Sequence, residues 1–100
     1  MRYFVLRYTL AADYLERRSS HRAAHLSLAT RFRDSGQLLL AGACLDPADE
    51  ALLVFRCASQ SEVEAFAKTD PYVKHGLVRA YAIREWAVAA GSLYDDGDEG

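Results

Sequence analysis

The chain has 100 residues, of which 51% are hydrophobic and 26% are charged, and its formal net charge is −2. This length suffices for one domain but not for two separate cores, and the composition is that of an ordinary globular protein. The charge balance, without a dense cluster of lysine and arginine, argues against nucleic acid as a partner. No apolar run approaches the roughly 18 residues that a membrane helix needs.

The first predicted element is a strand over residues 2–10, a run rich in β-branched and aromatic side chains. The N-terminal residues lack the long apolar stretch and the small-residue cleavage site of a signal peptide. We therefore expect a cytoplasmic protein.

Two helical segments are predicted next. Asp13 and Glu16 have the spacing of a capping box, which predicts a short helix starting there. Ser19-Ser20 interrupts that helix or offers a second N-cap. The main helix is predicted over residues 21–34, and Gly36 follows as a C′ residue that adopts a left-handed conformation at little cost.

A hairpin of two apolar strands is predicted over residues 37–44 and 51–58. The connection between them, residues 46–50, is short and polar, which favours antiparallel pairing. The two cysteines of the chain, Cys44 and Cys57, fall in these apolar runs. In a reducing compartment we expect them to be small buried hydrophobic residues rather than a disulfide or a nucleophile.

A second helix is predicted to begin at Ser61, which stands in capping-box spacing with Glu64. Val63 and Phe66, with Ala67 after them, give this helix its apolar face. Pro71 ends the helix, because the residue before a proline avoids the α region.

The last strand is predicted over residues 77–88, and the small, acidic residues 89–100 are expected to form a flexible tail. Residues 1–88 then form one α+β domain of β-α-β-β-α-β order. This order predicts a ferredoxin-like sandwich, with two helices on one face of a four-stranded sheet.

Both faces of the predicted strands are apolar, which bears on the oligomeric state. By strand alternation, Leu38 and Leu40 should point to one face and Leu39 and Ala41 to the other. Two helices cover only one face of the sheet. The simplest cover for the second face is another copy of the chain, so we expect a homodimer.

His25 is the first candidate functional residue. At 100° per residue it shares a stripe of the main helix with Leu28, Ala29 and Phe32, on the face that should pack against the sheet. A histidine in that position needs a hydrogen-bond partner.

Asp70 is the second candidate, because a carboxylate at the C-terminal end of a helix opposes the helix dipole and needs another reason to be there. In a split βαβ fold the two helices run antiparallel. The end of the second helix should therefore lie beside the first turns of the main helix, where Asp70 can reach His25 or Arg22.

Other interpretations of these residues stay open. His25 could be a core histidine, and an aspartate before a proline often only ends a helix. His21 and His25 have the i, i+4 spacing of two metal ligands, but the chain has no HExxH motif, so we expect no metal. Arg22 could bind an anionic substrate or be solvated, and Tyr72 could line a pocket mouth or only pack. No cofactor motif is present, so we expect no cofactor.

Three segments resemble the YciI-like (YCII-related) family. Residues 17–26 are similar to its R-x-x-H-L segment, and residues 34–42 to its helix-to-strand passage. Residues 70–77, together with 83–86, resemble its C-terminal signature, of which Asp-Pro-Tyr is the most specific part. The chain departs from the family at two points. It has Ala23 where the family often has proline, and Ala-Cys after Gly42 where the family usually continues with proline.

The resemblance implies the ferredoxin-like fold of the dimeric α+β barrels, with the residues that match His25 and Asp70 as the active-site pair. Relatives in the family include a dehydrochlorinase of aromatic degradation, and the wider fold includes muconolactone isomerases. The sequence-based hypothesis is therefore a cofactor-independent lyase or isomerase that uses His25 and Asp70 as an acid/base pair. Arg22 and Tyr72 would bind the small substrate. The alternative is a non-catalytic dimeric module that binds a small ligand or a protein.

Overall fold

The computed structural model describes residues 1–93. Its elements in chain order are β1 (Arg2–Leu10), α1 (Tyr14–Arg17), the 3-10 turn η1 (Arg18–Ser20), α2 (Arg22–Asp34), β2 (Leu38–Ala43), β3 (Glu50–Cys57), α3 (Gln60–Thr69), α4 (Pro71–Lys74) and β4 (Val78–Glu85). No helix in this part of the chain is both long enough and apolar enough to cross a membrane. The cytoplasmic location stays a prediction.

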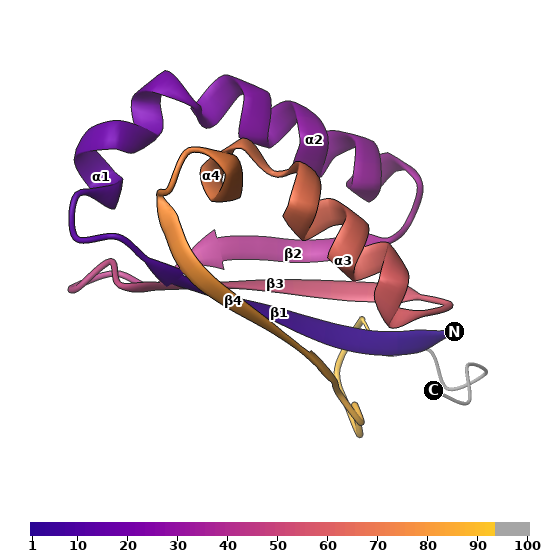
Figure 1. Ribbon diagram of the computed structural model, residues 1–100. Coiled ribbons are helices and arrows are strands. Elements are labelled where there is room, and N and C mark those ends of the chain that lie inside the picture. Colours follow the sequence, from indigo (N-terminus) through magenta and orange to yellow (C-terminus); the bar gives the residue numbers. More distant parts are fainter. Residues whose placement is uncertain (94–100) are drawn as a thin grey trace.

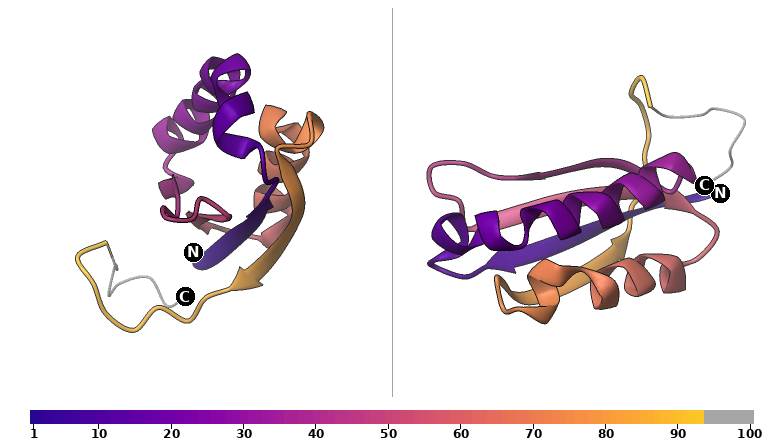
Figure 2. Two further views of the ribbon diagram at one scale, coloured as in Figure 1. Left: turned by 90° about the vertical axis from the view of Figure 1, so that its left-hand side faces the viewer. Right: turned by 90° about the horizontal axis from the view of Figure 1, so that it is seen from above.

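The four strands form one antiparallel sheet in the order β2-β3-β1-β4. All helices lie on the same face of this sheet (Figure 1). Figure 2 shows α2 and α3 side by side above the strands, each running along the sheet. The predicted α+β, ferredoxin-like arrangement is thus confirmed.

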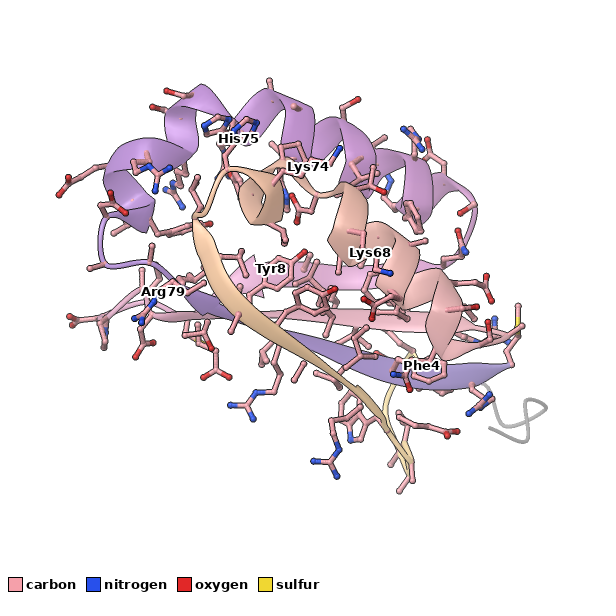
Figure 3. All side chains as sticks on the ribbon, in the orientation of Figure 1. Phe4, Tyr8, Lys68, Lys74, His75 and Arg79 are labelled. Atoms are coloured by element: carbon pink, nitrogen blue, oxygen red, sulfur yellow. The ribbon has the colours of Figure 1, made fainter. Side chains whose placement is uncertain are left out.

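The core fills the layer between sheet and helices, because side chains alternate along each strand. The inward-facing residues of β1 are all buried; they are Phe4, Leu6, Tyr8 and Leu10. The predicted apolar face of α3 is also buried, and Phe66 meets the rings of Phe32 and Phe55 edge-on. Figure 3 shows the Tyr8 side chain between the sheet and the helices.

The alternation expected for β2 was wrong at its start, because the strand contains a bulge. Leu38 pairs with Phe55, whereas Leu40 pairs with Val54, so the register shifts between them. A bulge sets two residues of one strand against one of its partner and turns the following side chains to the other face. Leu38 is accordingly 6% exposed and Leu40 is 61% exposed.

The short segments before α2 are not capped as predicted. The Asp13 side chain makes no cap hydrogen bond and instead lies 3.5 Å from the guanidinium of Arg17. Ser19 and Ser20 form part of η1, and the N-cap position of α2 is His21, which also has no side-chain cap. The prediction of an interruption here was correct, but its proposed serine cap was not.

The N-cap of α3 was predicted two residues too late, at Ser61. In the structure the N-cap is Ser59, whose backbone N–H donates to the carboxylate of Glu62 at 3.0 Å. Glu64, predicted for that role, accepts a hydrogen bond from the Tyr81 hydroxyl. Two Ser-x-x-Glu patterns overlap in this stretch, and the spacing alone does not distinguish them.

The remaining boundaries follow the predictions more closely. Gly36 ends α2 with a φ of 84°, as expected for a left-handed C′ residue. Both cysteines are free thiols; Cys57 is buried as predicted, but Cys44 is exposed, because it lies just beyond the end of β2.

The C-terminal part of the described chain runs on from β4 without further helix or strand. β4 ends at Glu85, three residues before the predicted end. The Trp86 N–H donates to the Tyr3 carbonyl oxygen at 2.8 Å, and the Tyr3 hydroxyl donates to the Leu93 carbonyl oxygen at 3.3 Å. Residues 94–100 of the predicted acidic tail lie outside the described residues, so the domain boundary and the tail stay predictions.

Candidate active site

Asp70 lies at the junction of α3 and α4. It is the C-cap of α3 and the N-cap of α4, and Pro71 occupies the first position of α4. The Asp70 carboxylate accepts the backbone N–H of Tyr72 at 3.0 Å. The predicted stop at Pro71 is correct for α3, but the helical turn that follows was missed. Because Asp70 caps that turn, its position at the end of α3 has a structural reason.

Three donors surround the Asp70 carboxylate. Oδ1 accepts from His25 Nδ1 at 2.8 Å and from the Tyr72 N–H, while Oδ2 accepts from the Tyr8 hydroxyl at 2.6 Å. Asp70 is 0% exposed and is the one buried charged residue among residues 1–93. The Tyr72 N–H can only donate and the Tyr8 hydroxyl donates to Oδ2, so the carboxylate is the acceptor of this network.

This hydrogen-bond network also assigns the protons of His25. Since an ionised carboxylate can only accept, Nδ1 carries the hydrogen that lies between His25 and Asp70. In the neutral imidazole Nε2 is then the nitrogen with a free lone pair. The His25 side chain is 12% exposed, so it is enclosed but reachable from the adjoining pocket.

Tyr8 is a site residue that the sequence did not reveal. Burial is the main reason why its pKa is raised, and the negative charge of Asp70 and the hydrogen bond to it raise the pKa further. Tyr8 therefore stays a neutral donor to Asp70. A signal was available, because Tyr8 stands on the inward face of β1, where a hydroxyl needs a partner.

Tyr72 forms the back of the site. Its ring stacks on the His25 imidazole, with centroids 4.0 Å apart and planes 8° from parallel. The ring of Tyr14 meets it edge-on at 5.6 Å. Tyr72 is only 3% exposed. It both packs and lines the pocket, but it does not stand at the mouth.

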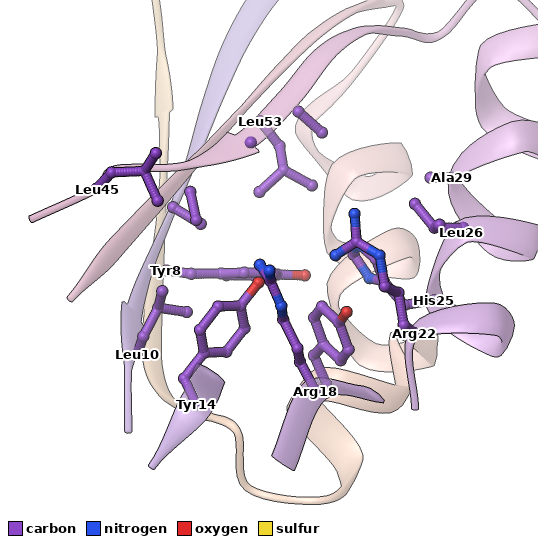
Figure 4. A pocket seen from close by; sticks show the side chains of 15 residues that line it. Tyr8, Leu10, Tyr14, Arg18, Arg22, His25, Leu26, Ala29, Leu45 and Leu53 are labelled. Atoms are coloured by element: carbon purple, nitrogen blue, oxygen red, sulfur yellow. The ribbon is translucent and has the colours of Figure 1, made fainter. Parts of the chain in front are cut away.

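A pocket of about 210 Å³ opens beside His25, between the helical segments and the inner face of β1, β2 and β3. Its lining is of three kinds: the tyrosines Tyr8, Tyr14 and Tyr72; the cations Arg18 and Arg22; and apolar groups such as Leu10, Leu26 and Leu53. Figure 4 shows these side chains gathered around the open space. A concave space with aromatic, apolar and cationic lining next to a histidine is typical of a small-molecule site.

Arg18 and Arg22 line the pocket, whereas the adjacent Arg17 does not. Arg17 donates to the His75 carbonyl oxygen at 2.6 Å and is not part of the lining. Arg18 lies over the Tyr14 ring, 5.8 Å from its centroid. Arg22 forms no ion pair with Asp70 or with another acidic side chain of residues 1–93, so the alternative pairing of Asp70 with Arg22 is not the one observed.

The two histidines with i, i+4 spacing, His21 and His25, do not converge on one point. His25 binds Asp70, whereas His21 stacks on the ring of His75 with centroids 4.2 Å apart. Within residues 1–93, no three histidine, cysteine, aspartate or glutamate side chains are grouped so that they could hold a metal ion.

Comparisons with known proteins agree with this fold. The family model of the YCII-related domain matches residues 1–87. No curated protein sequence matches the chain significantly.

Several solved structures are similar to the chain. 5-Chloro-2-hydroxyhydroquinone dehydrochlorinase from Burkholderia phenoliruptrix, in complex with 2,5-dihydroxybenzoquinone, has a TM-score of 0.75 at 22% identity, over 87% of this chain and 95% of that chain. A candidate antibiotic biosynthesis monooxygenase from Deinococcus radiodurans has a TM-score of 0.56 at 16% identity, covering 95% and 99%. An uncharacterised NIPSNAP domain protein from Burkholderia xenovorans has a TM-score of 0.55 at 11% identity, covering 96% and 100%. At these identities the likeness is one of fold.

Proposed function

The chain belongs to the YCII-related domain family, and on this premise we propose that it is a cofactor-independent enzyme that moves a proton on a small organic substrate. The reaction class is an elimination or an isomerisation, and His25 is its general acid/base. A dehydrochlorinase among the similar structures supports a small-molecule reaction of this kind.

One observation carries the proposal: the 2.8 Å hydrogen bond between His25 Nδ1 and the fully buried Asp70, beside the 210 Å³ pocket. In this arrangement Asp70 orients the imidazole and stabilises its protonated form. Stacking on Tyr72 fixes the plane of the ring. His25 Nε2 is left to exchange a proton with the substrate.

The proposed step balances without a cofactor. In an elimination, Nε2 accepts a proton from a carbon or hydroxyl of the substrate, the released electron pair forms a double bond, and the leaving group departs with its own pair. In an isomerisation, His25 returns the proton to a different atom of the same molecule. Arg22 and Tyr72 are proposed to bind the substrate, since both line the pocket.

The test is a pair of proton-transfer assays with wild type and His25→Asn. Chloride release from 5-chloro-2-hydroxyhydroquinone detects elimination, and deuterium uptake from solvent into small hydroxyquinones and keto acids detects proton exchange. We expect wild type to be active in one assay and His25→Asn to lose about 100-fold or more. His21→Asn is the matched control, because His21 lies one turn away without a carboxylate.

The opposite outcomes are equally clear. If wild type does not exceed the buffer rate in either assay, or if a folded His25→Asn keeps full activity, the enzyme proposal fails. The non-catalytic ligand-binding module then becomes the better description.

A homodimer through the outer face of the sheet is part of the same proposal. This face presents exposed apolar side chains on three strands or their ends: Leu40 is 61% exposed, Leu52 is 41% exposed and Trp86 is 48% exposed. A second copy of the same face would bury them. We expect light scattering to give the mass of a dimer for wild type and of a monomer for Leu52→Glu; a monomeric wild type would contradict the dimer.

A further inference from the structure

Two arginines line the pocket and have no acidic partner in the described part of the chain. Arg18 and Arg22 line the same cavity, one from η1 and the other from the first turn of α2. Neither forms an ion pair with an acidic side chain in residues 1–93, and the pocket lining contains no aspartate or glutamate. Asp70, the nearest buried carboxylate, is hydrogen-bonded to His25 and Tyr8 and not to either arginine. Two guanidinium groups at one cavity, without an acidic partner among residues 1–93, make it attractive to an anion.

The Tyr72 hydroxyl gives a second indication of a ligand in this pocket. Its oxygen is buried beside the Arg22 guanidinium, and within residues 1–93 it has no hydrogen-bond partner of good geometry, while the ring that carries it lines the pocket. Burial raises the pKa of Tyr72, and the neighbouring cations Arg22 and Arg18 offset part of that rise, so both guanidinium groups act on this hydroxyl. Burial of a hydroxyl without a partner is unfavourable, and a ligand oxygen would remove that cost.

The size and the walls of the pocket limit what this ligand can be. A volume of about 210 Å³ holds one ring with its substituents. Tyr8, Tyr14 and Tyr72 contribute aromatic groups to its lining, and Leu53 contributes an apolar one. A planar organic molecule fits such walls better than a compact, strongly hydrated inorganic ion.

We propose that Arg18, Arg22 and the Tyr72 hydroxyl form an anion subsite that selects small planar organic acids in their ionised form. A carboxylate or phenolate oxygen is held by the two guanidinium groups and accepts the Tyr72 O–H. The reacting part of the same molecule then lies toward His25. The subsite defines the substrate class of the proposed enzyme. Its role in a reaction rests on the proposed function, whereas anion binding does not depend on it.

Binding of a charged probe and its neutral counterpart tests the subsite directly. Benzoate and benzamide have nearly the same shape, and 4-nitrophenolate and 4-nitroanisole form a second pair. Each is titrated into the protein at constant ionic strength and followed by amide NMR shifts. We expect saturable binding of at least one anion, about tenfold or more tighter than its neutral partner, with shifts at Arg18, Arg22 and Tyr72.

Substitutions of single residues test which side chains bind the anion. Arg18→Ala and Arg22→Ala should each weaken anion binding about tenfold. Tyr72→Phe, which keeps the ring and removes the hydroxyl, should weaken it less but measurably. Arg17→Ala is the matched control and should change nothing, because Arg17 contacts the His75 carbonyl and lies outside the pocket lining.

The outcomes separate this inference from the proposed function. His25→Asn should keep the anion affinity within about twofold, since His25 holds none of the anion's charge in this account. Equal binding of the charged and neutral probes, or equal losses in Arg17→Ala and the two pocket variants, would overturn the subsite. Neither result decides the proton-transfer assays, which are read without these probes.

Discussion

Two histidines on one helix face show what makes a candidate site. His21 and His25 are one turn apart at the start of α2, and each stacks on a ring from the α4 segment: His21 on His75, and His25 on Tyr72. Among residues 1–93, His25 alone of the two also meets a carboxylate, that of Asp70. The two histidines share their helix face and their ring stacking. What distinguishes His25 is therefore the buried carboxylate of Asp70 and the groups that surround it.

That enclosure is built from three separate parts of the chain. Tyr8 comes from the middle of β1, the Tyr72 N–H from the first turn of α4, and His25 from α2. His75, at the other end of the α4 turn, is exposed. A charge can be kept in the core only where several donors converge on it. The site therefore lies at one end of α4 and not at the other.

The largest effect that the comparison predicts is on stability. Asp70→Ala should lower the free energy of unfolding by about 3 kcal/mol or more, because it leaves three buried donors without an acceptor. Urea unfolding measures the change. His75→Ala, which breaks only the surface stack, is the matched control. A loss below about 1 kcal/mol for Asp70→Ala would mean that the network does not stabilise the fold.

Tyr8→Phe sharpens the comparison by removing one donor and keeping the ring. The lost hydrogen bond to the buried carboxylate should cost about 1.5–3 kcal/mol in urea unfolding. Tyr81→Phe provides the control, since its hydroxyl also donates to a carboxylate, that of Glu64, but in a less buried place. Equal losses in the two variants would contradict a special role for Tyr8.

The raised pKa of Tyr8 predicts how stability depends on alkaline pH. An unfolded tyrosine ionises near pH 10, whereas burial and Asp70 keep Tyr8 protonated in the fold. The stability from this group is thus complete below about pH 10 and falls as pH rises above that value, by up to about 1.4 kcal/mol per pH unit. Tyr8→Phe should fall less steeply than wild type between about pH 10 and 11, and parallel curves would refute this role.

The smallest effect is predicted for the other histidine pair. His21→Ala removes the stack with His75 but no hydrogen bond to a carboxylate, so it should change the stability by about 0.5 kcal/mol or less. Anion binding should also be unchanged. A clear loss of either property would show that the His21–His75 stack supports the pocket, and that the two histidines differ less than the contacts indicate.

The positions of His25 and Asp70 could be predicted from the sequence, because they follow from helix periodicity and from the order of the elements. The helical stripe placed His25 on the buried face, and the antiparallel helices of the predicted fold brought Asp70 near it. The structure adds the contact itself, at 2.8 Å. Whether the pair is catalytic stays a prediction, because geometry alone does not establish turnover.

The rest of the site could not be predicted because it depends on irregular segments. Strand alternation places Tyr8 inward but does not say which group it meets across the fold. Tyr14 and Arg18 lie in α1 and η1, where no period extends far enough to fix a direction. The bulge near Leu39 is a local change of register that the apolar run does not encode visibly.

The protonation state of the His25 ring, read from ¹⁵N NMR at neutral pH, tests the proposed acid/base pair most directly. We expect neutral His25 to carry its hydrogen on Nδ1, held by Asp70, with Nε2 free. His21 and His75 serve as internal controls in the same spectrum. If His25 instead carries its hydrogen on Nε2, then Asp70 does not orient it, and the proposed acid/base pair is contradicted.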